Sequence, residues 1–149
     1  MSAIELLLRL AKIREDQAMA RAKRVAGQMG QTQAFKKQVL DYAREYEIQI
    51  LESGKSGASV AFIQDSNAFR EKLLVSSLEM DGQINSLTQA SAETLKIATQ
   101  ARMRTRGLSK LVEKKRREER KKRYKSELNQ FEDSYSARLN IETGTKDAC

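Results

Sequence analysis

The chain lacks proline, histidine and tryptophan, holds a single cysteine, and has only 5% aromatic residues. Without proline, no residue forces a helix to stop. Without histidine, Ser-His-Asp and Cys-His nucleophile systems and His-ligated metal sites are excluded. The carboxylates are interleaved with Lys and Arg, which is typical of a solvated helix face. We therefore predict no catalytic residue, no metal site, no cofactor and no enzyme activity.

The single cysteine and the short hydrophobic runs indicate where the protein acts. Cys149 has no second cysteine with which to form a disulfide, which favours a reducing compartment. No stretch approaches the roughly 20 apolar residues of a membrane span, and no small-residue cleavage site follows the leucines near the start. We predict a cytoplasmic protein that reaches a membrane only through a partner.

Hydrophobic residues recur in heptads over residues 4–52. Eleven of the fourteen positions in two seam rows are apolar, which is typical of a coiled coil. The first row is Leu8, Glu15, Ala22, Met29, Lys36, Ala43 and Ile50. The second row is Ile4, Ala11, Ala18, Val25, Thr32, Val39 and Tyr46.

A second heptad segment follows the sequence SGKSGAS at residues 53–59, the one turn-like stretch in the chain. Ten of its fifteen predicted seam positions are apolar. One row is Phe62, Phe69, Ser76, Gln83, Ala90, Ile97, Arg104 and Leu111. The other is Ser66, Leu73, Met80, Leu87, Thr94, Ala101 and Leu108.

These segments predict an all-α fold, a long two-helix antiparallel coiled-coil hairpin. We expect one domain over residues 1–139, with a helix at 4–52, a turn at 53–59 and a helix at 60–138. Folding about this turn pairs Ile50 with Phe62, Tyr46 with the level of Ser66, and Ile4 with Leu108. Residues 140–149 are expected to form a disordered tail.

The segment from Arg102 to Lys125 is strongly basic, with thirteen Lys or Arg against three Glu. Glu-to-Arg and Glu-to-Lys pairs four residues apart, such as Glu113 with Arg117, favour a helix here. The segment is either a dock for an acidic partner or a solvated helix face. Nucleic acid is disfavoured as a partner, because one aromatic residue, Tyr124, is present for stacking and Glu residues interrupt the run.

Aromatic residues gather near the predicted turn. Packing in the seam explains Tyr46, Phe62 and Phe69 without any binding role. Tyr42 lies outside the seam and is harder to bury in a two-helix structure. An aromatic patch on the flank of a hairpin is also a natural site for protein binding.

The chain resembles the FliJ family of flagellar type III export proteins. The resemblance rests on LDYAREYEIQIL at 40–51, the SGKSGAS turn, FIQDSNAFREKLL at 62–74, LSKLVEKKRREERKK at 108–122 and FEDSYSAR at 131–138. It implies a hairpin resembling the rotor stalk of rotary ATPases. Family members often carry a tryptophan in the middle of the second helix, which is absent here and leaves open a relative from a needle-type secretion system.

The resemblance also implies partners and a location. It implies a stalk component that binds a FliI-like hexameric export ATPase, an FlhA-like export gate and export chaperones, in the cytoplasm and peripherally at the inner face of the cell membrane. The family's gate-binding positions correspond to Tyr42, Tyr46, Phe69 and Leu73. We assign the basic residues to the ATPase or another acidic partner: Arg102, Arg104, Lys110, Lys114, Lys115, Arg116, Arg117, Arg120, Lys121 and Arg123. The rival interpretations are a nucleic-acid-binding coiled coil and a homo-oligomeric structural coiled coil.

Overall fold

The computed structural model describes residues 2–147, which form two long helices, α1 (Ala3–Lys55) and α2 (Val60–Asp147). No strand occurs among the residues described, so the all-α prediction is confirmed. The chain divides into two compact units. We call Lys12–Arg102 the hairpin unit, and Met1–Ala11 with Met103–Cys149 the terminal unit.

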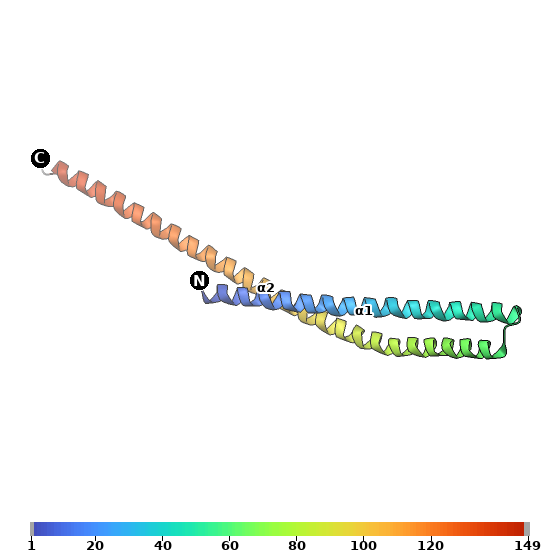
Figure 1. Cartoon of the computed structure of the whole chain (residues 1–149). Helices are drawn as coiled ribbons and strands as arrows, with labels where there is room; N and C mark the ends of the chain where they lie inside the picture. The colour runs from blue at the N-terminus through green and yellow to red at the C-terminus, as the bar shows by residue number, and fades with distance from the viewer. Residues whose placement is uncertain (1, 148–149) are drawn as a thin grey trace. The chain divides into compact units, whose positions relative to one another are not determined.

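In the hairpin unit the two helices run side by side in opposite directions (Figure 1). Tyr46 contacts Phe69, with ring centroids 4.9 Å apart, and Lys36 forms an ion pair with Asp81. Further from the turn, the Thr88 hydroxyl lies 3.5 Å from the sulfur of Met29. Because the partner number rises as the α1 number falls, the pairing is antiparallel and the predicted hairpin is confirmed.

The seam of α1 follows the predicted heptads. Every one of its fourteen predicted positions is buried or half-buried, and the residues between them from Leu6 to Ile50 are exposed. Lys36, a polar exception in the seam, is accounted for by its ion pair with Asp81 across the helices. The alternating three- and four-residue spacing therefore identified the buried face of α1 in full.

Only one of the two rows predicted for the seam of α2 is buried. The row from Ser66 to Leu108 is buried or half-buried throughout, but Phe62, Phe69, Ile97 and Leu111 of the other predicted row are exposed. The row one residue later lies in the seam instead. It consists of Ile63, Arg70, Ser77, Ile84, Ser91, Ala98, Thr105 and Val112.

The row that begins with Ile63 is buried or half-buried, although the row that begins with Phe62 is more hydrophobic, because the two helix backbones approach each other closely. Ala98 is completely buried, and small side chains at such positions let helices pack closely. The hydroxyls of Ser77 and Thr94 donate to carbonyl oxygens of their own helix, those of Leu74 (2.7 Å) and Ala90 (2.9 Å). Burying these hydroxyls therefore leaves no donor unsatisfied.

The pairing register is also displaced from the predicted one. Tyr46 meets Phe69, one helical turn beyond the predicted level of Ser66. The cause lies at the turn, because α1 continues through Ser53 and Gly54 and ends at Lys55. A later helix end moves the midpoint of the connection along the chain and shifts every cross-helix pair with it.

The turn itself is built by Gly57 and Ser59. Gly57 has a positive φ of 82°, and the N–H of Ala58 donates to the carbonyl of Ser53 (2.9 Å). This bond, with a left-handed residue just before its donor, is the Schellman motif that ends many helices. Ser59 then caps α2, because its hydroxyl oxygen accepts the N–H of Phe62 (3.2 Å).

The two neighbouring glycines of the turn segment should respond to alanine in opposite ways. Gly57→Ala is expected to lower the free energy of unfolding by about 1 kcal/mol, because a Cβ disfavours the left-handed conformation. Gly54→Ala is expected to raise it by up to about 1 kcal/mol, because Gly54 is helical and an added Cβ meets no atom within 4 Å. Urea unfolding followed by circular dichroism measures both. Equal effects from the two substitutions would contradict the cap assigned to Gly57.

The end of the chain differs from the predicted disordered tail. Helix α2 continues through Asp147, so the prediction is wrong for residues 140–147, while residues 148 and 149 lie outside the described residues. No proline lies in this segment, so every residue there keeps the backbone N–H that a continuing helix needs. Among the described residues, neither helix contains a segment long and apolar enough to cross a membrane.

In the terminal unit, the start of α1 packs on α2 around Val112. Ser2 and Glu5 form the S-x-x-E pattern of a capping box, with the N–H of Glu5 donating to the Ser2 hydroxyl (3.4 Å). Ile4, Glu5, Val112, Lys115 and Arg116 line a common groove. Ile4 therefore lies beside Val112, one turn beyond the predicted Leu108. From residue 113 to residue 144 every side chain of α2 is exposed.

Candidate partner-binding surfaces

The ten predicted basic binding residues are all exposed. Arg102 belongs to the hairpin unit and the other nine to the terminal unit. Exposed lysine and arginine side chains attract an acidic partner, and this attraction weakens as the salt concentration is raised. The structure therefore leaves this basic segment open to solvent along one helix.

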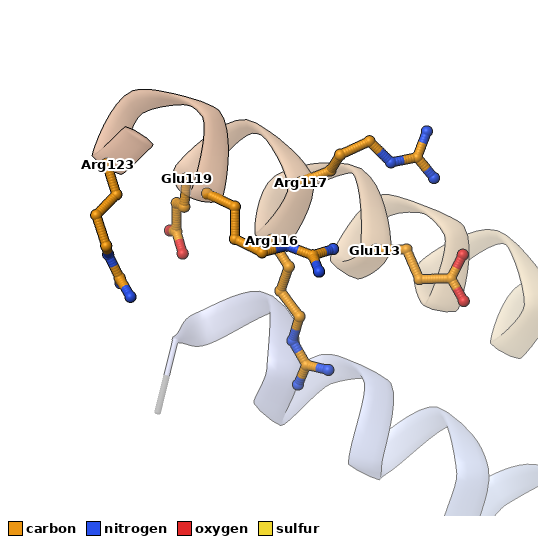
Figure 2. A pocket seen from close by; sticks show the side chains of 6 residues that line it. Glu113, Arg116, Arg117, Glu119 and Arg123 are labelled. Carbon is orange, nitrogen blue, oxygen red and sulfur yellow. The ribbon is translucent and has the colours of Figure 1, made fainter. Parts of the chain in front are cut away.

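Part of the basic segment forms an open groove of charged side chains. Figure 2 shows Glu113, Glu119 and several arginines of α2 around it, with the beginning of α1 nearby. Its lining consists of Glu113, Arg116, Arg117, Glu119, Arg120 and Arg123. Flexible, exposed and charged walls give no fixed, water-excluding cavity. The groove is therefore an open, charged surface of α2.

One arginine of this groove is already engaged. Arg116 donates to a carboxylate oxygen of Glu5 (3.3 Å). This hydrogen bond, together with the backbone N–H of Ser2, lowers the pKa of Glu5 below its ordinary value. A carboxyl whose pKa is lowered by folding stabilises the fold above its ordinary pKa, and the contribution is lost as the pH falls through the lowered value.

Removing the arginine should therefore raise the pKa of Glu5. Arg116→Ala is expected to move it toward the ordinary range but not all the way, because the Ser2 bond remains. Carbon-detected NMR of the Glu5 carboxyl across a pH titration measures the change. Arg117→Ala serves as the matched control and should leave the Glu5 titration where it is. An unchanged curve for Arg116→Ala would show that the ion pair does not form in solution.

Aromatic side chains near the turn gather on one side of the hairpin unit. Phe35 of α1 lines a groove with Ser76 of α2. Tyr42 lies one heptad after Phe35, and Phe62 and Phe69 lie two and one heptads before Ser76. Residues one heptad apart share a helix face. We call Phe35, Tyr42, Phe62 and Phe69, all exposed, the turn-end aromatic face.

The four residues predicted to bind the export gate divide between this face and the seam. Tyr42 is 58% exposed and Phe69 is 45% exposed. Tyr46 and Leu73 are half-buried in the seam. Tyr46 stacks at a tilt of 52° on Phe69, a geometry that favours both rings. Tyr42 and Phe69 are therefore open to solvent, while the ring of Tyr46 packs against that of Phe69.

A further exposed apolar row was missed in the sequence. Tyr124, Leu128, Phe131 and Tyr135 follow one another at spacings of four, three and four residues, and all are exposed on α2. We call these four residues the distal stripe. The spacing is the signal that could have revealed it. Continuing the predicted seam led instead to the charged positions Lys115, Glu118, Lys122 and Lys125.

The structure thus defines a helical hairpin protein whose exposed basic, aromatic and apolar rows are suited to binding other proteins. The family model described as flagellar FliJ protein matches residues 1–143. The chain therefore belongs to the FliJ family, and it has a role connected with flagellar protein export. No curated protein and no solved structure gave a significant match.

Proposed function

We propose that this chain acts as a stalk component of the flagellar export apparatus. In this role its terminal unit binds the hexameric export ATPase through the basic segment, and its turn-end aromatic face binds the export gate. It also handles export chaperones, and it has no catalytic activity of its own. It works in the cytoplasm and is held at the inner face of the cell membrane by these partners.

The exposure of the basic segment is the observation that supports the proposal most. From residue 113 to residue 144 every side chain of α2 is exposed and none packs into a core, yet the match to the family extends to residue 143. Nine basic residues of the predicted set lie in this unit. A helix with this much exposed positive charge is suited to fast, electrostatically steered association with an acidic protein.

Adding the purified chain to the cognate export ATPase tests the proposal directly. We expect turnover to rise and the hexameric fraction to increase, with saturation at a defined ratio of chain to hexamer. The gain should shrink as salt is raised, because exposed charges are screened. Unchanged turnover and no co-elution with the ATPase would contradict the proposal.

Nucleic acid binding is the rival use of the same basic segment. Glu113 and Glu119 lie in the same groove as the arginines, where their carboxylates would face phosphate groups. Nucleic acid binding is favoured when lysine and arginine neutralise phosphates and release the counterions condensed on the nucleic acid, and a facing carboxylate opposes this. We therefore expect no gel shift with duplex or single-stranded nucleic acid at low salt, and a shift that weakens steeply with salt would favour the rival.

A further inference from the structure

The distal stripe has the pattern of a helix-pairing seam. Tyr124 and Phe131 are each 69% exposed, and Tyr135 is 59% exposed. Single exposed apolar residues are ordinary on protein surfaces, but four of them aligned over about three helical turns mark an interaction site. The stripe lies on a different side of α2 from Val112, whose row continues into Lys115 and Glu119. The stripe is therefore not an extension of the seam between α1 and α2.

We propose that the distal stripe pairs with the distal stripe of a second copy of this chain, in antiparallel orientation. The charges before and within the stripe determine this choice of partner and direction. Residues 114–125 carry nine Lys or Arg and two Glu, whereas residues 126–139 carry three acidic residues and one Arg. A parallel pair would bring one basic segment against the other. An antiparallel pair keeps the two basic segments apart, at opposite ends of the paired stripes, and sets Lys125 of each copy against Glu132 of the other.

The heptad positions make this complementarity specific. With Leu128 of one copy against Phe131 of the other, Tyr124 meets Tyr135 at both ends of the stripe. Lys125 and Glu132 then occupy the flanking positions that face each other across an antiparallel seam. The two-fold symmetry of the pair forms the Lys125–Glu132 contact twice. A second copy thus satisfies the apolar row and its flanking charges together.

The pairing should be reversible and concentration-dependent, because the stripe is short. Sedimentation velocity of the full chain over a concentration series should show a monomer giving way to a dimer. Phe131→Glu is expected to raise the dimer dissociation constant at least tenfold. Met103→Glu is the matched control, since Met103 is 67% exposed on α2 outside the stripe, and it should leave dimerisation unchanged. Circular dichroism checks that both variants keep their helicity.

A charge exchange tests the orientation. Lys125→Glu and Glu132→Lys should each weaken the dimer when alone, because like charges then face each other. Mixing the two variants in equal amounts should restore dimerisation, since both flanking contacts of the mixed pair become attractive. A dimer that the mixture does not restore would overturn the antiparallel arrangement.

The other possible occupants of the stripe give different results. A chain that stays monomeric at all concentrations overturns the proposal, and so does a dimer that Phe131→Glu does not weaken. If the chain is monomeric and Phe131→Glu abolishes stimulation of the export ATPase, the stripe is an ATPase contact. If the monomer floats with acidic phospholipid vesicles and Phe131→Glu does not, the stripe binds membrane. The loss of self-pairing would leave the proposed export role intact, so the two proposals fail separately.

Discussion

Val39→Asp is expected to lower the free energy of unfolding of the hairpin unit by about 3 kcal/mol, measured by urea titration. Val39 is 8% exposed and lies in the seam of α1. The substitution removes the burial of an apolar side chain, worth about 1.5–3 kcal/mol, and it places a carboxylate in the seam, where ionisation is penalised. A seam one side chain thick has no second layer that could compensate for the loss.

Val75 provides the matched control for this prediction. It is the same residue type in the same unit, but it is 55% exposed. Val and Asp have similar helix propensities. Val75→Asp therefore measures what the same substitution costs at an exposed helix position, without the loss of burial in the seam. We expect a change within about 0.5 kcal/mol for Val75→Asp. Comparable losses for the two variants would mean that the seam assigned to α1 is not the buried face in solution.

The first helix could be predicted almost completely from its heptads, and the second could not. In α1, mostly apolar or small residues recur at alternating spacings of three and four residues, so the pattern identified a single buried face. In α2, two neighbouring rows compete, and the aromatic side chains of Phe62 and Phe69 favoured the wrong one. Hydrophobicity is a local property, whereas the choice between adjacent rows depends on how closely α1 approaches. Ala98 and Ser77 allow that approach, and a ring at their positions would prevent it.

The binding surfaces were predictable to a similar degree. Exposure of the basic residues followed from their charge alone, because isolated Lys and Arg side chains are rarely buried. Tyr42 was correctly placed outside the seam. The exposure of Phe62 and Phe69 could not be foreseen, because it follows from the choice of row in α2. The same error of extending one row hid the distal stripe, whose residues lie on another side of the helix.

Changes to the basic segment and to the turn-end aromatic face should each weaken binding to one partner and leave binding to the other intact. Replacing Arg117, Arg120 and Arg123 with Glu is expected to reduce stimulation of the export ATPase at least tenfold, because three attractive charges become repulsive. Arg116 is left in place so that its ion pair with Glu5 survives. Gate binding should stay within a factor of about two, because the hairpin unit is untouched. Steady-state turnover and calorimetric titration with the gate domain measure the two effects.

The complementary variant changes the turn-end aromatic face. Tyr42→Ala with Phe69→Ala is expected to weaken gate binding about thirtyfold, which corresponds to about 2 kcal/mol for the two aromatic side chains together. Stimulation of the ATPase should be unchanged.

Two control variants show whether the same change in charge, or the same loss of apolar side chains, has an effect when it is made elsewhere in the chain. Glu at Arg44, Lys72 and Lys96 matches the charge change of the first variant away from the basic segment. Ala at the exposed residues Leu78 and Leu95 matches the apolar loss of the second. If either test variant reduces both activities equally while helicity is preserved, the two surfaces form one binding site, and a stalk that holds different partners at different places no longer fits. Only the crossed pattern supports a chain that couples one partner to the other.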